Sequence, residues 1–528
     1  MNSADGSVAQ RNSALLLPAL LCLQALLFLI DHFINFKPLW VDEGYSALLA
    51  RRSFSEIHQA LIYDAGPPLY YDLLHIWRAV FGESELALRS LSLLFGLLST
   101  VLLYHFAKRW LSPRTAFYAA LIWVVHPLSL FYLSQARNYT LLIALAIWYA
   151  DRLLAYLHTQ KFTDLLQIAL ALTLSVYNHN IAWYVAMAGG LSSLYFTRDW
   201  KRIGALFIAH VIPVLFFLPW LPVMQQQLAN TEMTTAWIKD VWTVFAPLIS
   251  ILCLSIGATL NHMTHPWTLL LFLPMLAFWP IINYRWPDFF PDEQKKRVRW
   301  LRLFSIFLLL GPWLQSVLSD PIYIITRTDF IALPFLAIAV APGFTRFPNL
   351  KLLWKTLILI GLVAPILVAV GFGVGSERGI PTSFGQKYLS EKTITDYIER
   401  QGKPGDIVIC TDVSRPVIEY YLSPKGFNFT SFPPDMNDQL AHYNENWYRE
   451  NLNLEQEAIT TIQTAKNLLQ EDSSMWVVVS FRSPVSKFLE EALQSDAELF
   501  GSPNPIRAPR MGIRMPVTDM FIFRYEQR

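Results

Sequence analysis

Two adjacent carboxylates, Asp42 and Glu43, stand where the first apolar segment of the chain meets a polar, aromatic loop. A carboxylate can act as a general base when a substrate proton lies within hydrogen-bond reach. Because a charge close to hydrocarbon is costly, acidic residues at the mouth of a membrane span indicate a functional site when the surrounding loop is also polar. Asp42 could instead cap a helix over residues 46–51. Glu43 could hold Asp42 in place, pair with an arginine or simply be solvated.

The same loop holds a second carboxylate and two tyrosines around a rigid proline step. Asp64 could bind an acceptor, although Asp before Gly-Pro-Pro is also the ordinary residue that begins a turn. The Pro67-Pro68 step would keep the loop extended and could aim Tyr70 and Tyr71 at the lipid interface, where they would otherwise form a plain aromatic belt.

Three arginines, Arg89, Arg137 and Arg327, each lie at a polar end of an apolar segment. The guanidinium fork suits a phosphate held at the depth of lipid headgroups, while snorkelling at a helix end is the alternative. Tyr139 follows Arg137 closely and is a candidate substrate contact. His179 lies in a polar Asn-His-Asn stretch that could line a cavity or bridge two helices.

The rest of the chain must position these residues within a membrane. Its 528 residues are 54% hydrophobic, 14% aromatic and only 16% charged, with a mean hydropathy of +0.34. This composition excludes an ordinary soluble enzyme or a disordered tail and predicts a polytopic α-helical membrane protein. Apolar runs long enough to be candidate spans recur near 14–36, 86–107, 115–133, 139–157, 165–180, 182–197, 203–222, 241–260, 267–284, 301–319, 329–345 and 352–374. The formal charge of +2 gives no indication of nucleic-acid binding.

The first apolar run resembles a retained helix rather than a cleaved signal peptide. One arginine, Arg11, precedes it, and no small-residue cleavage site comes before Lys37-Pro38. The N-terminus is therefore expected in the cytoplasm. The three cysteines are too few for a disulfide framework, since Cys22 and Cys253 lie in apolar runs and Cys410 stands alone. Asp, Glu and His can bind metals, but no triad of them has the spacing of metal ligands, so the sequence indicates no required metal or other cofactor and leaves a divalent metal open.

The basic residues predict the orientation of the chain in the membrane. They cluster at 108–114, 198–202, 295–302 and 346–355, and the positive-inside rule assigns these segments to the cytoplasm. The acidic pair then faces outward. Twelve full crossings would place the 295–302 cluster outside, so we expect segment 241–260 to be re-entrant or interfacial. About eleven crossings, within a range of roughly 11–13 spans, then leave the C-terminal tail outside.

The composition becomes that of a soluble domain from Ser376. We therefore divide the chain into a transmembrane domain, 1–375, with a catalytic outward loop at 37–85, and an extracytoplasmic α/β domain, 376–528. The expected helices of this domain are 393–400, 416–422, 454–470 and 484–493, and the expected strands are 407–411, 476–481 and 520–525.

The order of the polar motifs resembles that of a known family of membrane glycosyltransferases. The motifs are Val41-Asp42-Glu43-Gly44-Tyr45, Asp64-Ala65-Gly66-Pro67-Pro68-Leu69-Tyr70-Tyr71, Leu88-Arg89-Ser90, Ala136-Arg137-Asn138-Tyr139, Tyr177-Asn178-His179-Asn180, Pro219-Trp220-Leu221-Pro222 and Thr326-Arg327. They resemble the protein O-mannosyltransferase type, the family 39 group of GT-C fold that also includes the bacterial aminoarabinose transferases acting on lipid A. The chain departs from the pattern where Gly66 replaces a frequent His and Thr328 replaces a frequent Tyr.

The resemblance implies transfer of a sugar from a polyprenyl (undecaprenyl or dolichyl) phosphate donor. An exterior site has no access to cytoplasmic nucleotide sugars, so the donor must cross the bilayer on a lipid. Asp42 matches the family's catalytic aspartate, and one base with direct in-line attack would invert the anomeric centre. The implied partners are the lipid donor, the bilayer and a protein, lipid or polysaccharide acceptor, with a bacterial inner membrane as the expected location.

Two other classes of protein fit the composition. A secondary transporter or flippase would also place carboxylates and arginines among many spans, but transporters show paired halves with broken helices at the midplane. Here the charges gather in one large loop before the second span, which favours an enzyme. A receptor or assembly factor anchored by the helices would need far fewer of them.

Overall fold

The computed structural model describes most of the chain. It covers residues 3–35, 38–230, 238–256, 291–344, 385–411, 414–434, 445–469, 473–479, 484–495, 506–507 and 521–526. Two expected spans, 267–284 and 352–374, the basic cluster at 346–355 and the boundary expected at 375–376 lie outside these residues. The division into two domains therefore stays a prediction.

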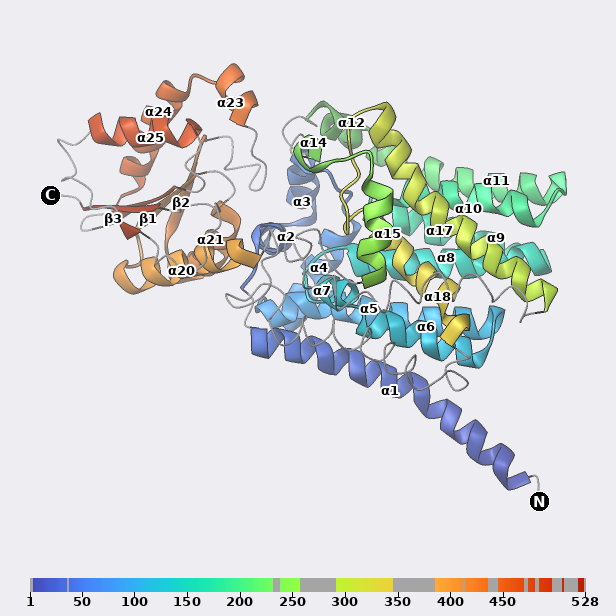
Figure 1. Cartoon of the computed structure of the whole chain (residues 1–528). Helices are drawn as coiled ribbons and strands as arrows, with labels where there is room; N and C mark the ends of the chain where they lie inside the picture. The colour runs from blue at the N-terminus through green and yellow to red at the C-terminus, as the bar shows by residue number, and fades with distance from the viewer. Residues whose placement is uncertain are drawn as a thin grey trace.

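The described residues before 345 form a bundle of helices with a group of short helices at one end (Figure 1). Its helices are α1 (Ser3–Asn35), α2 (Val41–Arg51), α3 (Phe54–Ala60), η1 (Leu61–Tyr63), α4 (Leu69–Phe81), α5 (Glu85–Trp110), α6 (Pro113–Val125), α7 (Pro127–Leu133), α8 (Tyr139–Thr159), α9 (Phe162–Asn178), α10 (Ala182–Phe196), α11 (Trp200–Phe217), η2 (Leu218–Trp220), α12 (Leu221–Ala229), α14 (Ile238–Val241), α15 (Ala246–Ile256), α17 (Asp292–Leu318), η5 (Asp329–Ala332) and α18 (Leu333–Phe344).

Local signals set the ends of the short helices that follow α2. Ser53 begins α3 with a capping box, in which its side chain accepts from the Glu56 amide while Glu56 reaches back. Gly82 ends α4 with a positive φ of 84°, which favours glycine. Ser84 then caps α5 by accepting from the Ala87 amide. The chain therefore turns back into the bundle within a few residues.

Among the described residues, five helices are long and apolar enough to cross a membrane: Leu15–Phe33 within α1, α5, α8, Trp200–Ala229 (α11 to α12) and α17. The expected run 115–133 is not one straight helix. It forms α6 and α7, bent by 63°, because Pro127 has no amide proton with which to continue α6. The pair counts as a sixth candidate span. From the expected span 241–260, the structure describes α15, which has 11 residues.

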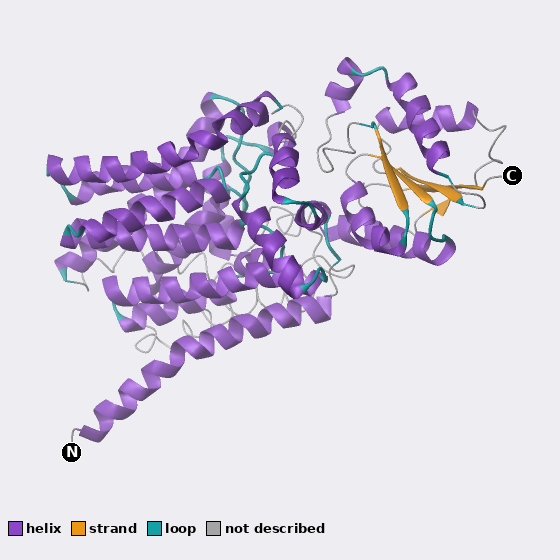
Figure 2. Ribbon diagram, turned by 180° about the vertical axis from the view of Figure 1, so that it is seen from behind, coloured by secondary structure: helices purple, strands orange, loops and turns teal. Residues whose placement is uncertain are grey.

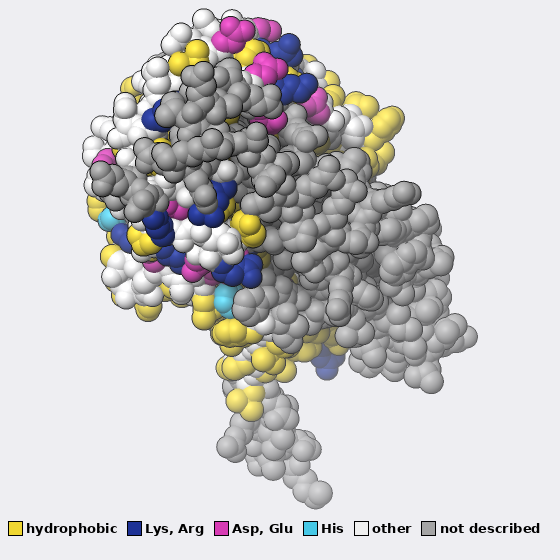
Figure 3. Space-filling model, turned by 90° about the vertical axis from the view of Figure 1, so that its left-hand side faces the viewer, with side chains coloured by type: hydrophobic (Ala, Val, Ile, Leu, Met, Phe, Trp, Pro, Cys, Tyr) yellow, Lys and Arg dark blue, Asp and Glu magenta, His cyan; other side chains and the backbone are white. Residues whose placement is uncertain are grey.

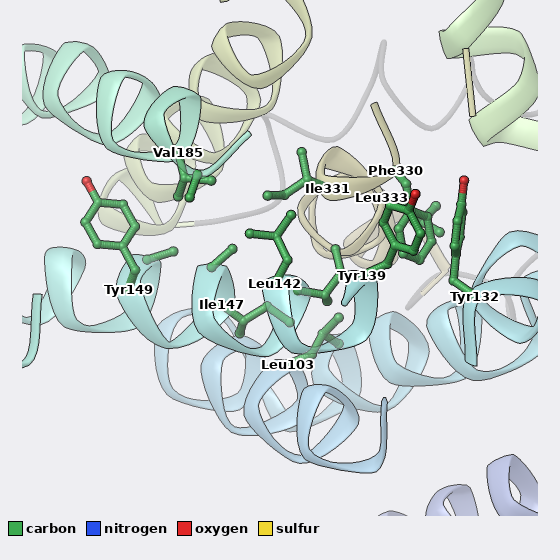
Figure 4. Packing of buried hydrophobic residues seen from close by; sticks show 14 of the residues in the cluster. Leu103, Tyr132, Tyr139, Leu142, Ile147, Tyr149, Val185, Phe330, Ile331 and Leu333 are labelled. Carbon is green, nitrogen blue, oxygen red and sulfur yellow. The ribbon is translucent and has the colours of Figure 1, made fainter. Parts of the chain in front are cut away.

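The bundle exposes large apolar side chains as a membrane protein does. On α11 alone, Phe207, Ile208, Leu215 and Phe216 are exposed, an arrangement that a soluble surface rarely shows. Inside the bundle, the helices pack through aromatic and branched side chains. Figure 4 shows Tyr132 and Phe330 near Leu333 at one end of this core and Tyr149 near Val185 at the other. The chain is an integral membrane protein.

The two ends of the bundle differ in charge. At one end the basic segments meet: Arg297 donates to the Trp110 carbonyl at 3.0 Å, and Arg109 pairs with Asp151 at 3.3 Å. The short helices α2, α3 and α4 lie at the opposite end (Figure 1). The described basic segments and the acidic loop therefore lie at opposite ends of the helices, as the positive-inside rule predicts for opposite sides of a membrane.

The C-terminal part contains a five-stranded sheet beside the end that holds α2 (Figure 2). The strands are β1 (Ile407–Thr411), β2 (Asn428–Phe432), β3 (Ser474–Val479), β4 (Ile506–Arg507) and β5 (Phe521–Glu526), in the order β2-β1-β3-β5-β4. The helices are α20 (Gly385–Gln401), α21 (Arg415–Leu422), η8 (Ser423–Lys425), α23 (Glu445–Asn451), α24 (Leu454–Leu468) and α25 (Pro484–Ser495). β1 pairs in parallel with β2 and β3, while β5 runs antiparallel to β3 and β4.

This part has the α/β architecture that the sequence predicts, with a core on each face of the sheet. Its described surface carries acidic and basic side chains intermixed (Figure 3), as is usual for a surface in water. β2 and β4 were not predicted from the sequence. β2 carries polar residues among its apolar ones, and β4 has only two residues, so neither gives a clear strand pattern.

Candidate active site

Asp42 lies in the first turn of α2, and two arginines from distant parts of the chain point at its carboxylate. Its Oδ2 atom is 3.4 Å from Arg327 Nη2 and 3.8 Å from Arg137 Nη2. The Asp42 side chain is 24% exposed, so a substrate can reach it. The residue that precedes α2 is Trp40, so Asp42 is within the helix rather than in the capping position that was the alternative.

Arg137 comes from the loop between α7 and α8. Its Nη1 atom donates to the Asp42 carbonyl at 3.4 Å, to Ser46 Oγ at 3.4 Å and to Tyr71 Oη at 3.2 Å. Burial alone would lower the pKa of Arg137, but the nearby Tyr71 and Asp42 outweigh it and raise this pKa. The guanidinium is therefore a fixed positive charge beside the carboxylate.

Arg327 comes from the turn between α17 and η5. Thr326 before it has a φ of +67°, a left-handed conformation that is uncommon for a threonine. Tyr132 holds the turn by donating to the Thr326 carbonyl at 2.7 Å. The Arg327 guanidinium lies over the ring of Tyr139, with its carbon 5.8 Å from the ring centre. Two segments distant in sequence, those of Arg137 and Arg327, thus converge on Asp42.

Asp64 lies behind Tyr71, in a chain of hydrogen bonds that leads to Arg137. Tyr71 Oη donates to Asp64 Oδ2 at 2.8 Å and accepts from Arg137. Gln227 fixes the loop before the prolines by donating to the Leu61 carbonyl at 2.7 Å and the Gly66 carbonyl at 2.9 Å. The two carboxylates are therefore joined through one tyrosine and one arginine.

His179 lies near the site, with its ring centre 5.9 Å from that of Tyr139. Its Nδ1 atom accepts from the Ile181 amide at 3.1 Å. Burial, together with the nearby positive charges of Arg327 and Arg137, lowers the pKa of His179 to about 3. The imidazole is neutral at physiological pH, so it can fill and polarise the site but does not add charge to it.

Glu43 and Arg89 form a buried pair outside this cluster. Arg89 Nε and Nη2 each donate to Glu43 at 2.8 Å, and the two side chains are 2% and 1% exposed, respectively. Glu43 Oε1 also accepts from the Ala136 amide at 2.8 Å. The Arg89 guanidinium is enclosed and bonded to Glu43 in this structure, so its contact with a lipid phosphate stays a prediction. Of the possibilities for Glu43, the structure shows the pairing with an arginine.

The sequence suggested that the rigid proline step could aim Tyr70 and Tyr71 at the lipid. In the structure they do not face it. Both are buried. Tyr70 Oη lies 3.1 Å from Ser92 Oγ, and Tyr71 joins the polar chain described above. The two residues lie in the first turn of α4, which packs against α2 and α5, so their rings are inside the protein instead of forming an aromatic belt.

Several residues around Asp42 were not found from the sequence. Ser46 stands one helical turn after Asp42 and donates to its carbonyl at 2.8 Å, a spacing that could have identified it. Tyr132 and Gln227 act through backbone carbonyls of loops distant in sequence. No local pattern marks such contacts.

Tyr71→Phe tests the chain between the two carboxylates. The change keeps the ring, which packs edge-on against Tyr45 at 6.1 Å, but removes the hydroxyl that joins Asp64 and Arg137. We expect turnover to fall about tenfold, because a hydrogen bond to a charged group contributes roughly 1.5–3 kcal/mol. Steady-state kinetics would measure this fall in turnover. Tyr104→Phe, a change of another buried tyrosine far along α5, is the control; equal activities of wild type and Tyr71→Phe would contradict the role.

The chain resembles known proteins in part of its sequence and in its fold. Residues 65–224 match the family described as dolichyl-phosphate-mannose-protein mannosyltransferase. That range includes Arg137, Tyr139 and His179, while Asp42 and Arg327 lie outside it. No curated protein matches the chain in sequence.

Solved membrane enzymes have the same architecture over nearly the whole chain. ArnT from Cupriavidus metallidurans in the apo state has a TM-score of 0.59 at 14% identity, covering 99% of this chain and 98% of that one. The same protein bound to undecaprenyl phosphate gives 0.58 at 13% identity, with coverages of 96% and 97%. An oligosaccharyltransferase from Archaeoglobus fulgidus gives 0.50 at 11% identity, with coverages of 92% and 73%. The resemblance indicated by the sequence motifs is confirmed at the level of the fold: the chain is a membrane protein with the GT-C architecture of these solved glycosyltransferases.

Proposed function

We propose that the chain transfers a sugar from a polyprenyl phosphate to an acceptor outside the cytoplasm. One observation carries this proposal: Asp42, a reachable carboxylate, lies beside the guanidinium groups of Arg137 and Arg327. A base for the acceptor and two cations for the leaving phosphate are what such a transfer requires. The likeness in fold to ArnT, which was solved with bound undecaprenyl phosphate, supports the lipid carrier.

The reaction is a single displacement at the anomeric carbon. Asp42 takes the proton of the acceptor hydroxyl or amine as the acceptor atom forms its bond to that carbon. The bond from the anomeric carbon to the phosphate oxygen breaks, and its electron pair leaves with the polyprenyl phosphate. Arg137 and Arg327 stabilise the negative charge that gathers on this phosphate. One base and one displacement invert the anomeric centre.

The remaining polar residues have supporting roles in this proposal. Asp64, held by Tyr71, binds the acceptor, while Tyr139 and His179 line the site next to Arg327. Glu43 acts on Asp42 through the helix, by fixing the start of α2 with Arg89. The acceptor is a protein, a lipid or a polysaccharide, and the location is a bacterial inner membrane with residues 376–528 outside the cytoplasm. The sheet lies at the same end of the bundle as α2, the helix that carries Asp42, which supports this placement.

The function is tested with purified protein in detergent, where a transporter has no gradient to use. We expect the protein to move a labelled sugar from a polyprenyl phosphate donor to an acceptor extract and to release free polyprenyl phosphate. Separate donors carrying a hexose and an aminopentose would identify the sugar class. Binding of every donor without release of polyprenyl phosphate would contradict the proposal and favour transport.

Arg137→Lys and Arg327→Lys test the binding of the phosphate. Lysine keeps the positive charge but loses the planar fork, which can hold two phosphate oxygens at once. We expect the KM for the lipid donor to rise about tenfold in each variant, and by more when both are changed, in steady-state kinetics. The control is Arg109→Lys at the opposite end of the bundle, where the side chain is 42% exposed. An unchanged donor KM in the double variant would exclude the phosphate role.

A further inference from the structure

The C-terminal part contacts α2, the helix that carries Asp42, through α21. At the closest point Gly44 meets the first turn of α21. A Cβ atom on Gly44 would lie 2.9 Å from the Pro416 carbonyl carbon and 2.9 Å from the Val417 amide nitrogen. Both are backbone atoms, so no side chain can move aside. Only glycine permits α21 to lie this close to α2, and Figures 1 and 2 both show the two helices next to each other.

The start of α2 is held by the other end of α21. Tyr421 Oη accepts from the Leu39 amide at 3.0 Å and donates to the Glu85 carboxylate. Glu85 lies 3.7 Å from Arg89, which forms the buried pair with Glu43. A tyrosine from the C-terminal part is therefore joined to the segment just before Asp42 and to the ion pair beside it.

The last residue of α2 is held as well. Arg51 donates to Ser423 Oγ at 2.8 Å and to the Tyr420 carbonyl at 3.1 Å. Its guanidinium carbon lies 5.2 Å from the centre of the Tyr420 ring. Contacts at the start, middle and end of an 11-residue helix fix its position along its whole length.

Asp42 is on the other face of the same helix. Residues seven apart, such as Gly44 and Arg51, share a face, whereas residues two apart differ by about 200°. Asp42 and Ser46 accordingly face away from α21 and toward Arg137. The helix lies between the C-terminal part and the site, so any shift of α21 would shift Asp42 relative to its arginines.

We infer that α21 sets the position of the catalytic base, with Gly44 and Tyr421 as positioning residues. This inference rests on the proposed role of Asp42. Neither residue touches the site itself. Because displacements of about 1 Å can reduce turnover by roughly two orders of magnitude, the close fit of α21 against α2 is enough to control the rate. The C-terminal part thus affects the rate of transfer by contacting the face of α2 opposite Asp42.

Gly44→Ala is the test, because it adds one methyl group at the contact. The matched controls are Gly190→Ala and Gly204→Ala, also within helices, where an added Cβ meets no atom within 4 Å. Alanine by itself favours a helix, so a loss seen only at position 44 reports the clash. We expect kcat to fall at least about tenfold while the donor KM stays within about threefold. Peptides covering residues 39–51 should exchange their amide hydrogens faster.

Tyr421→Phe provides a second variant, in case Gly44→Ala does not fold. It keeps the ring and removes the hydroxyl that joins Leu39 and Glu85, so we expect kcat to fall about fivefold with an unchanged donor KM. Tyr397→Phe is its control, because Tyr397 packs its ring against Trp476 within the C-terminal part.

The outcomes separate this inference from the proposed function. The inference is supported if the variants show faster amide hydrogen exchange in residues 39–51 and a lower kcat while the controls behave as wild type. Three results would overturn the inference. They are a turnover within twofold of wild type in the folded variants, an equal loss of turnover in the control variants, and unchanged amide hydrogen exchange in residues 39–51. A wild-type protein that transfers no sugar would refute the proposed function, while the exchange comparison, which needs no turnover, would still decide whether α21 holds α2.

Discussion

Asp42→Asn should remove nearly all sugar transfer while the protein remains folded and binds its lipid donor. Asparagine has almost the same shape as aspartate but cannot take a proton from the acceptor. General-base catalysis contributes about 10²- to 10⁴-fold, so kcat should fall by that range in an assay of polyprenyl phosphate release. The donor KM should change little, because Arg137 and Arg327 still face the phosphate.

The control for this variant is Asp292→Asn. Asp292 begins α17 at the opposite end of the bundle, and its side chain is 99% exposed, so the same chemical change there should leave turnover as in wild type. Full transfer by Asp42→Asn would show that another group is the base. Asp64, the second carboxylate of the site, would then be the residue to test.

The second large effect is on stability. Arg89→Met should lower the free energy of unfolding by about 3–5 kcal/mol, because it leaves the Glu43 carboxylate buried without its partner. Glu43→Gln should lower the free energy of unfolding by a similar amount, because it leaves the Arg89 guanidinium buried without its partner. Thermal unfolding in detergent, followed by tryptophan fluorescence, would show both losses as lower midpoints.

The double variant Glu43→Gln with Arg89→Met should recover most of this loss, because two neutral side chains then face each other. Arg109→Met, which breaks the more exposed pair with Asp151, should cost less than about 1 kcal/mol. An unfolding midpoint of Arg89→Met equal to that of wild type would show that the pair of Glu43 and Arg89 does not stabilise the protein. If the double variant is less stable than either single one, uncompensated charge is not the cause.

The sequence predicts the class of fold well because hydropathy follows directly from composition. The ends of α5 and α8 agree with the expected runs within a few residues, and the helices around β1 and β3 fall where apolar periodicity predicts them. The break between α6 and α7 was missed, although His126-Pro127 marks it. An apolar run alone does not show a bend within a span.

The site was predictable in part for a different reason. The order of the motifs predicts that Asp42, Arg137 and Arg327 share one site. Which arginine pairs with which carboxylate depends on contacts between distant segments. Arg89 and Arg137 have similar sequence contexts, each at a polar helix end. The structure buries Arg89 against Glu43 and leaves Arg137 beside Asp42. Whether an arginine is buried in a pair or lies beside Asp42 depends on where its partner carboxylate lies in the fold. No local sequence pattern shows that position.

The role of the C-terminal part was also beyond sequence analysis. The basic clusters predict its side of the membrane, but they do not predict which residues it contacts. The contact of Gly44 with the α21 backbone depends on how two distant helices meet. Glycine within a helix signals only that some close approach or flexibility is present there.

The account depends on Asp42 facing the side of the membrane where only a lipid carrier can deliver a sugar. Labelling of single cysteines in sealed right-side-out vesicles tests this most directly, with Cys22, Cys253 and Cys410 replaced and either Asp42→Cys or Arg109→Cys introduced. A membrane-impermeant maleimide should label the protein carrying Asp42→Cys at once and the protein carrying Arg109→Cys only after the vesicles are opened. Labelling in the reverse order would place the carboxylate in the cytosol and contradict the account.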